Sequence, residues 1–430
     1  MNAPTKSDGK GLHSALRYNF MALVGNENVR AATAADAVCG VQPKLVIEPR
    51  TESEVSEILR LSNEAGLAVI PRGGGTKSGW GNAPVRADLV LSTARLTEII
   101  EHAWADLTVT VEAGCAVQRL QETLAEHGQR LALDPLWPEK ATIGGVLSAN
   151  DSGALRLRFG ALRDLIIGAT IALPDGTLAS SGGKVVKNVA GYDLPKLVTG
   201  ALGTLGIITR AVFRLHPLPR NTRAFSVSAT NAEAAQRFVL AVQDSKLAHT
   251  FLQSHFSDDN PPVSEILFEG TEEGLAAQEA QLRSLPAPAS VSEASTSAWS
   301  AREELWALSE PQNTAIAKIS ILPANLARTM KLVQHIANGQ QVRWRALVYA
   351  TGIGWLRWKG KPGALRGTLH TLRGELESHG GSLLALHRPE KMTAFDAWGS
   401  TGDALPLMKA VKQQLDRKNT LNPGRFVGGI

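Results

Sequence analysis

Two glycine-rich segments constrain the fold of this chain more than any other feature of its sequence. The first occupies residues 71–81 (PRGGGTKSGWG) and directly follows an expected strand at Leu67–Ile70. The second occupies residues 142–153 (TIGGVLSANDSG). Residues without a Cβ let backbone N–H groups come close to a bound diphosphate. Two such segments can face each other across an extended dinucleotide, although either one alone could equally make a simple turn.

Other nucleotide signatures are absent from the sequence. The glycines of residues 200–206 (GALGTLG) recur every third position, whereas a dinucleotide fold of the Rossmann type requires G-x-G-x-x-G. Thr76 stands where a Walker loop needs its last glycine. The pattern therefore disfavours an NAD fold and an ATPase.

Periodicity predicts an α+β chain with more than one core. A strand at Leu45–Ile47 and a capping box at Thr51–Glu54 open a β–α–β unit. Asp175-Gly176 predicts a hairpin between the strands at 166–172 and 177–179. Pro217 and Pro219 then mark a boundary near Arg220, after which strands and helices alternate again.

Composition limits the classes of function. The 430 residues carry a net charge of +5, with 45 basic and 40 acidic residues and no long blocks of one sign, so nucleic acid is a weak candidate ligand. The N-terminus resembles no signal peptide and no uncharged run is long enough to cross a bilayer, so we expect a cytoplasmic protein. Two cysteines cannot hold an iron–sulfur cluster by four thiolates.

The motifs taken together resemble FAD-binding oxidoreductases of the vanillyl-alcohol oxidase type, and within them the FAD-binding subunits of glycolate oxidases. The resemblance runs from residue 43 to residue 219 through PRGGGTKSGWG, TIGGVLSANDSG, FGALRDLIIG, GGKVVKNVAGYDLPKLVTG and ALGTLGIIT. The ending Asn422-Pro423-Gly424-Arg425 resembles that of the glycolate oxidase subunit.

The resemblance implies an α+β fold with a two-subdomain PCMH-type FAD-binding domain and a ferredoxin-like α+β cap. On this basis we place an N-terminal arm at residues 1–41, the FAD-binding domain at 42–220 and the cap at 221–405. A C-terminal helix and tail at 406–430 are expected to return to the FAD-binding domain.

The resemblance also implies which residues approach FAD. The first segment would wrap the pyrophosphate and the second would approach ribityl and phosphate groups. The residues along the adenine or flavin edge would be Gly203, Thr204, Gly206, Ile207 and Ile208. The implied cofactor-binding residues are Pro71, Arg72, Gly73, Gly74, Gly75, Thr76, Lys77, Ser78, Pro135, Thr142, Ile143, Gly144, Gly145, Ser148, Ala149, Asn150, Ser152, Gly153, Gly203, Thr204, Gly206, Ile207, Ile208 and Asn422.

Two departures from the family refine the expectation. The first loop has no histidine at Ser78 or Trp80, so we expect noncovalent FAD. The related subunits carry a metal-coordinating histidine segment in the cap, whereas residues 343–349 here read RWRALVY, and we nominate no metal. The catalytic residue is unassigned; Lys187 is a weak candidate for stabilising reduced flavin, with a solvated surface lysine as the alternative.

These features favour two functions. The first is an FAD-dependent enzyme that oxidises a small 2-hydroxy acid such as glycolate or lactate and passes the electrons on. The alternative is an electron-relay subunit in a glycolate oxidase-type complex with a second flavin subunit and an iron–sulfur subunit, through which a membrane could be reached without a direct span. A third and less favoured hypothesis is a ligand-binding protein without redox activity.

Overall fold

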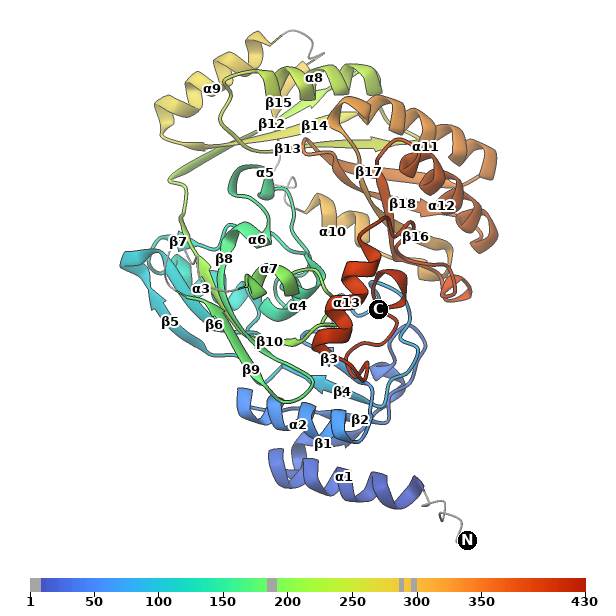
Figure 1. Cartoon of the computed structure of the whole chain (residues 1–430). Helices are drawn as coiled ribbons and strands as arrows, with labels where there is room; N and C mark the ends of the chain where they lie inside the picture. The colour runs from blue at the N-terminus through green and yellow to red at the C-terminus, as the bar shows by residue number, and fades with distance from the viewer. Residues whose placement is uncertain (1–8, 184–191, 286–289, 295–299) are drawn as a thin grey trace.

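The computed structural model describes residues 9–183, 192–285, 290–294 and 300–430. They form two lobes (Figure 1). We refer to residues 9–217 as the N-terminal lobe and to residues 221–387 as the cap. Helices and sheets are mixed in both lobes, which confirms the expected α+β class.

A four-stranded sheet delivers the first glycine-rich segment. Its order is β1-β2-β4-β3, with β1 at Val29–Ala31, β2 at Leu45–Ile47, β4 at Leu89–Ser92 and β3 at Val69–Arg72. The β2, β4 and β3 strands are parallel, because α2 crosses over from β2 to β3. Thr51 caps α2 as predicted, accepting a hydrogen bond from the backbone N–H of Glu54 at 3.1 Å. The chain therefore leaves β3 directly into the glycines.

A five-stranded antiparallel sheet forms the rest of the N-terminal lobe. Its order is β5-β6-β10-β8-β9, with β5 at Ile99–Ala103, β6 at Thr108–Glu112, β10 at Ile207–Arg214, β8 at Ile166–Ala172 and β9 at Leu178–Gly182. The β8–β9 pair is the predicted hairpin. A short pair, β7 (Gln129–Arg130) with β11 (His216–Pro217), lies outside this sheet.

The helices of this lobe are short after the first two. They are α1 (Gly9–Val24), α2 (Glu52–Glu64), α3 (Val117–Ala125), α4 (Ile143–Ala149), α5 (Arg156–Phe159), α6 (Leu162–Leu165) and α7 (Leu194–Val198). The second glycine-rich segment forms α4, whose apolar side chains Ile143, Val146 and Leu147 join the core of the five-stranded sheet.

The cap is built on one eight-stranded antiparallel sheet. Its order is β15-β12-β14-β13-β17-β18-β16-β19, with β15 at Ser290–Glu293, β12 at Asn221–Ser228, β14 at Val263–Gly270, β13 at His249–Ser257, β17 at Arg343–Tyr349, β18 at Ile353–Lys359, β16 at Thr314–Ser320 and β19 at Ser382–His387. The cap helices are α8 (Ala232–Asp244), α9 (Glu272–Ser284), α10 (Ala301–Trp306), α11 (Leu326–Gln340) and α12 (Pro362–Glu377).

The cap contains the ferredoxin-like arrangement twice. Residues 221–293 run β12-α8-β13-β14-α9-β15, and residues 314–387 run β16-α11-β17-β18-α12-β19. Each half has the same strand order, and the halves join where β13 pairs with β17. The expected ferredoxin-like cap is thus present as two units that share one continuous sheet.

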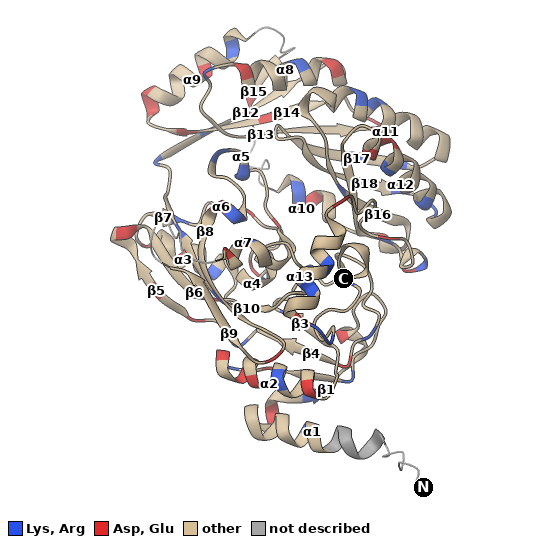
Figure 2. Cartoon of the chain, in the orientation of Figure 1, with Lys and Arg blue, Asp and Glu red and all other residues tan. Residues whose placement is uncertain are grey.

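The two faces of the cap sheet have different surroundings. The long helices α8, α9, α11 and α12 cover the outer face and enclose the largest apolar core (Figure 1). The other face carries residues such as Phe251, Leu347 and Trp355, which pack with Trp80 and Leu136 of the N-terminal lobe. Charged residues of both signs are spread over both lobes (Figure 2).

The C-terminal segment lies against the N-terminal lobe. The backbone N–H of Val69 donates to Thr420 O at 2.7 Å, and that of Asn422 donates to Val69 O at 3.0 Å. Lys412, on α13 (Leu405–Leu415), is buried and donates to Thr204 O at 2.8 Å. The domain limits at residues 41, 220 and 405 stay predictions. No helix among the described residues is long and apolar enough to cross a membrane.

Candidate functional site

The two glycine-rich segments lie against each other. A Cβ atom at Gly73 would lie 2.0 Å from Thr142 Oγ1, and one at Gly74 would lie 1.7 Å from the carbonyl oxygen of Lys140. Heavy atoms cannot approach this closely, so a side chain at Gly74 would require the backbone at Lys140 to move, and one at Gly73 would require the Thr142 side chain to move. Gly75 has a φ of +71°, which L side chains rarely adopt.

Together the segments enclose a cavity, which we call the cradle. It is lined by Pro71, Arg72, Gly73, Gly74, Gly75, Thr76, Lys77 and Ser78 from the first segment, by Thr142, Gly145, Ser148 and Ala149 from the second, and by Leu202, Asn422 and Arg425. Most of these residues were expected at the cofactor from the sequence. Leu202 and Arg425 were not.

Three residues that line the cradle each carry a buried polar atom without a hydrogen-bond partner in the described part of the chain. Among the residues that the structure describes, Thr142 Oγ1, Asn422 Oδ1 and Arg425 Nε have no hydrogen bond. Buried polar atoms in folded proteins are normally hydrogen-bonded, so these three indicate a polar ligand. The residues present therefore fit a diphosphate-bearing cofactor.

Arg425 also fixes the shape of the first loop. Its guanidinium donates to Ser78 O at 2.7 Å and to Trp80 O at 2.5 Å. Burial lowers the pKa of Arg425 from its ordinary value. The C-terminal tail thus supplies the cradle with a buried cation and holds the glycine loop in place.

Other expected cofactor residues lie around the cradle rather than in its lining. The backbone N–H groups of Ile143 and Gly144 donate to Cys115 O at 3.0 Å and Ala113 O at 2.8 Å, so they are already used inside the lobe. A Cβ at Gly203 would lie 3.3 Å from Pro71 Cγ. The remaining members of this set are buried in the N-terminal lobe behind the cradle: Thr204, Gly206, Ile207 and Ile208.

Four further predicted residues, Pro135, Asn150, Ser152 and Gly153, are absent from the lining of the cradle. Asn150 ends α4 in the left-handed conformation, and its Oδ1 has no partner among the described residues. Pro135, Ser152 and Gly153 lie where the two lobes meet. Lys187 falls within residues 184–191, outside the described part of the chain.

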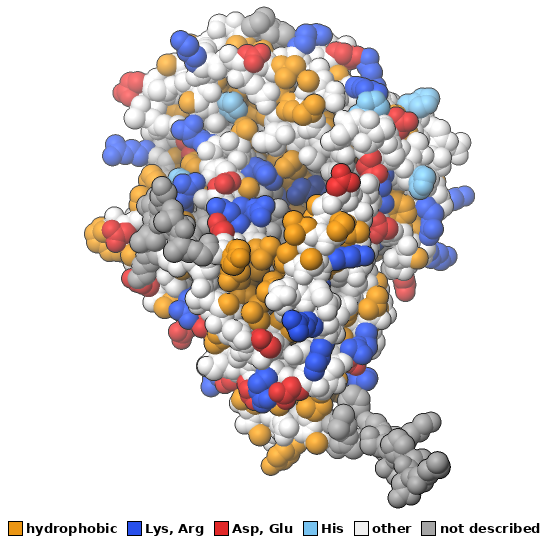
Figure 3. All heavy atoms as spheres, viewed as in Figure 1, with side chains coloured by type: hydrophobic (Ala, Val, Ile, Leu, Met, Phe, Trp, Pro, Cys, Tyr) orange, Lys and Arg blue, Asp and Glu red, His pale blue; other side chains and the backbone are white. Residues whose placement is uncertain are grey.

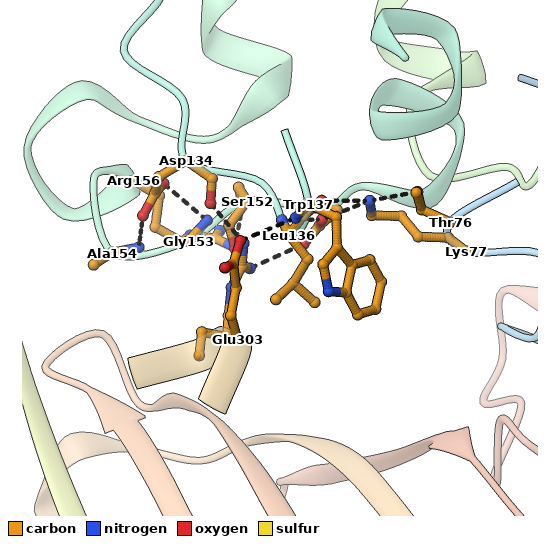
Figure 4. A network of polar contacts seen from close by, with 12 residues as sticks. Thr76, Lys77, Asp134, Leu136, Trp137, Ser152, Gly153, Ala154, Arg156 and Glu303 are labelled. Atoms are coloured by element: carbon orange, nitrogen blue, oxygen red, sulfur yellow. Dashed lines mark hydrogen bonds and ion pairs between the residues drawn. The ribbon is translucent and has the colours of Figure 1, made fainter. Parts of the chain in front are cut away.

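A network of buried charges joins the cap to the N-terminal lobe (Figure 4). Arg302 on α10 donates to Asp151 Oδ1 at 2.9 Å and to Asp134 O at 2.6 Å. Lys77 Nζ lies 3.1 Å from Asp151 Oδ2 and donates to Leu136 O at 3.1 Å. Two cations, one from each lobe, therefore share a single carboxylate.

This network gives Lys77 a different partner from the one that its loop suggests. Lys77 lines the cradle, but its ammonium forms an ion pair with Asp151. Burial is the largest influence on the ammonium and lowers the pKa of Lys77, against the attraction of Asp151. The cradle loop is thereby coupled through Asp151 to the cap.

The two buried aspartates of the network differ in their charge preference. Burial would raise the pKa of Asp151, but Arg302 and Lys77 outweigh it and hold that pKa below its ordinary value. Burial raises the pKa of Asp134 to about 6, against Arg302 and the N–H group of Ala154. Of the two aspartates, Asp151 is therefore the one whose ionised form is favoured.

Next to this network a cavity of about 450 Å³ lies between the lobes. The N-terminal lobe contributes residues 133–136 to its lining, and the cap contributes Phe251, Gln253, Arg302 and Tyr349. The volume lies in the usual range for small-molecule sites. On the face drawn in Figure 3, basic side chains gather along the boundary of the two lobes.

Lys318 on β16 extends from the inner face of the cap sheet into this junction. Its Nζ lies 5.7 Å from the centre of the Trp355 ring, and Arg302 stacks on the same ring at 5.2 Å. Burial lowers the pKa of Lys318 to about 8, and Arg156 of the N-terminal lobe adds to the shift. No carboxylate of the described residues forms an ion pair with Lys318.

Donor groups accumulate at this junction. The indole N–H groups of Trp80, Trp306 and Trp355 are buried without a hydrogen-bond partner among the described residues. Trp80 and Trp306 stack with their ring centres 5.9 Å apart. These three rings belong to the apolar cluster that packs between the lobes, and neither they nor Lys318 line the 450 Å³ cavity.

Comparison with known proteins identifies the first part of the chain. Residues 43–182 match the family model of the FAD binding domain. These residues contain both glycine-rich segments and the strands that carry them. Residues 43–182 form an FAD-binding domain.

Relatives of this domain occur in enzymes named for 2-hydroxy acids. The glycolate oxidase subunit GlcD of Bacillus subtilis is 34% identical over 211 residues, which cover 49% of this chain and 45% of that protein. The D-lactate dehydrogenase of Archaeoglobus fulgidus is 35% identical over 46% of this chain and 44% of its own length. The mitochondrial D-2-hydroxyglutarate dehydrogenase of Bos taurus is 35% identical over 45% of this chain and 36% of its own length. The match thus spans less than half the length of these relatives.

Solved structures share the whole fold. An alkyldihydroxyacetonephosphate synthase aligns with a TM-score of 0.75 at 18% identity, over 99% of this chain and 87% of that protein. p-Cresol methylhydroxylase aligns with a TM-score of 0.78 at 15% identity, over 97% of both chains. The FAD-binding domain and its cap therefore have the architecture expected from the sequence.

Sequence reasoning missed the partners that connect the FAD-binding domain to the cap. Asp151 lies inside the second segment and Arg425 inside the C-terminal motif, so both could have been nominated from those motifs. Arg302 and Lys318 stand in the cap without any motif. Within the described residues no group of three or more His, Cys, Asp or Glu side chains could hold a metal ion, and the expectation of no metal stays a prediction.

The charge network predicts the effect of losing its cap member. Arg302→Met leaves buried Asp151 with one cation instead of two, and should destabilise the junction by roughly 3–5 kcal/mol. Urea unfolding followed by tryptophan fluorescence measures this, because the rings of Trp137 and Trp306 meet at the junction 5.4 Å apart. Arg366→Met on the exposed face of α12 should change stability by less than about 0.5 kcal/mol. Equal losses in the two variants would contradict this role.

Proposed function

We propose that this chain is an FAD-dependent oxidoreductase that oxidises a small 2-hydroxy acid. The observation that carries the proposal is the cradle, in which two glycine-rich segments meet around a cavity whose lining residues include buried polar atoms without a partner among the described residues. The relatives of the FAD-binding domain are named for glycolate, D-lactate and D-2-hydroxyglutarate, which share the 2-hydroxy acid group.

The residues at the lobe junction suit such a substrate. Lys318 has a cationic head group without an ion-pair partner among the described residues, and Arg156 lies close enough to influence its pKa. In our proposal these two cations bind the substrate carboxylate, and the apolar ring of Trp355 excludes water and strengthens that attraction. Bound FAD would accept the two electrons released when the substrate hydroxyl is converted to a carbonyl group.

We infer that FAD is held without a covalent bond. None of the residues lining the cradle is a histidine or a cysteine. The nearby thiol of Cys39 lies 3.8 Å from Gly79 O and does not line the cavity. Precipitation of the yellow protein with acid should leave its flavin in solution; flavin that stays with the pellet would overturn this inference.

Gly145 provides a clean test of the cradle. A Cβ there would meet only Thr142 Oγ1, at 3.2 Å, so a larger side chain enters the cavity without striking backbone. Gly145→Val should reduce FAD retention by at least tenfold while leaving the far-ultraviolet circular dichroism unchanged. Gly339→Val, at an exposed site on α11 with open space around it, is the matched control. Full flavin content in Gly145→Val would reject the cradle as the FAD site.

Anaerobic spectroscopy tests the reaction. Mixing the FAD-loaded protein with glycolate, D-lactate or D-2-hydroxyglutarate should bleach the visible flavin absorbance with at least one of them. The electron-relay alternative retains the same cofactor but predicts that none of these acids bleaches it. Reduction by a partner flavin subunit alone would therefore favour the relay role, which stays a prediction here along with its partners.

The pKa of Lys318 predicts how substrate binding depends on pH. The carboxylate binds to protonated Lys318, so kcat/KM should be highest below pH 8 and fall as the pH rises through about 8. Lys318→Gln should raise KM by roughly tenfold or more. Lys318→Arg keeps its charge and should abolish the fall above pH 8, whereas Lys331→Gln on the outer helices should leave the profile unchanged. An identical pH profile in wild type and Lys318→Arg would contradict the role.

A further inference from the structure

Strands β17 and β18 of the cap sheet carry two pairs of basic residues directly opposite each other on one face. The register of β17 with β18 places Arg343 opposite Lys359 and Arg345 opposite Arg357. Side chains alternate along a strand, so these four share the inner face of the sheet with Trp355. Like charges placed directly opposite each other on adjacent strands repel.

The outer pair is neutralised by carboxylates. Arg343 forms ion pairs with Asp258 and Asp259, and Lys359 forms one with Glu310. The repulsion between these two cations is therefore offset within the chain.

The inner pair has no such compensation. Among the residues that the structure describes, no carboxylate forms an ion pair with Arg345 or Arg357. Arg357 makes long contacts to the carbonyl oxygens of Glu304 and Leu305, at 3.4 and 3.5 Å. Burial lowers the pKa of Arg357, and the charge of Arg345 lowers it further. The two arginines therefore repel each other at positions where uncharged residues would not.

Both pairs line a cavity of about 600 Å³. All of its lining residues belong to the cap, and none is shared with the cradle or with the junction cavity. Five basic side chains, the fifth being Lys361, line it with only two carboxylates, Asp258 and Glu310, each of which is already paired. The cavity therefore has a surplus of positive charge and the volume of a small-molecule site.

We propose that this cavity is a binding site for a small, multiply charged oxyanion that carries phosphate or carboxylate groups, with Arg345 and Arg357 as its principal contacts. Guanidinium groups bind both kinds of oxyanion through paired N–H donors. A bound anion between the two arginines would replace their repulsion by two charge-assisted contacts. The site is separate from the cradle, so the proposal does not depend on the flavin reaction.

Calorimetric titration of the full-length, FAD-loaded protein tests the site, because bound FAD keeps the probes out of the cradle. Inorganic pyrophosphate and citrate serve as separate probes, each at an ionic strength held constant with potassium chloride. Wild type should bind one equivalent of at least one probe, and a preference for pyrophosphate or for citrate distinguishes a phosphate-bearing from a carboxylate-bearing ligand. Binding that is absent from wild type, or not saturable, would overturn the proposal.

A pair of double variants makes the test specific. Arg345→Gln with Arg357→Gln should weaken binding on the order of a hundredfold, since each arginine contributes roughly tenfold through charged hydrogen bonds. Arg237→Gln with Arg366→Gln removes the same charge from exposed positions on α8 and α12 and should bind as wild type does. Equal affinity in the two double variants would overturn the assignment.

Thermal unfolding separates loss of the site from loss of the fold. Without a probe, the Arg345→Gln and Arg357→Gln double variant should melt at or above the wild-type temperature, because the repulsion is gone. With the probe, wild type should melt higher and this variant should not. A variant that melts well below wild type without the probe would show that the two arginines stabilise the cap itself, and would contradict the proposal.

Discussion

The close approach of two backbone segments is the constraint on which the rest of this structure depends. Gly73 and Gly74 lie so near Thr142 and Lys140 that no side chain fits between them. The strand β3 and the helix α4 bring these segments together from two different sheets of the N-terminal lobe. The cradle therefore forms only when both sheets are folded and packed, so cofactor binding and folding of this lobe are coupled.

A second interaction links the cradle loop to the cap. Lys77 of the glycine loop and Arg302 of the cap both form ion pairs with the carboxylate of Asp151. A buried charge network of this kind adds little net stability, but it fixes how its partners are oriented. The same contact places Trp355 and Lys318 of the cap sheet over the junction where a substrate is proposed to bind.

Local patterns in the sequence were enough to predict the β–α–β unit, the β8–β9 hairpin and the residues of both glycine segments, because these depend on neighbours along the chain. The network around Asp151 was not predictable, since Arg302 lies 151 residues farther on and belongs to no motif. The doubled ferredoxin-like cap left no visible repeat, because the two halves need only the same pattern of apolar and polar positions and not the same residues. The contribution of Lys187 stays untested, because it lies outside the described residues.

The central claim is that the cradle binds a diphosphate through its backbone and buried polar atoms. ADP and adenosine differ only by that diphosphate, and their competition with FAD for the apoprotein, followed by flavin fluorescence, measures its contribution directly. The account predicts that ADP displaces FAD at a concentration at least about a hundredfold lower than adenosine does, since two or more charged hydrogen bonds are lost without the diphosphate. Equal potency of the two competitors would contradict it.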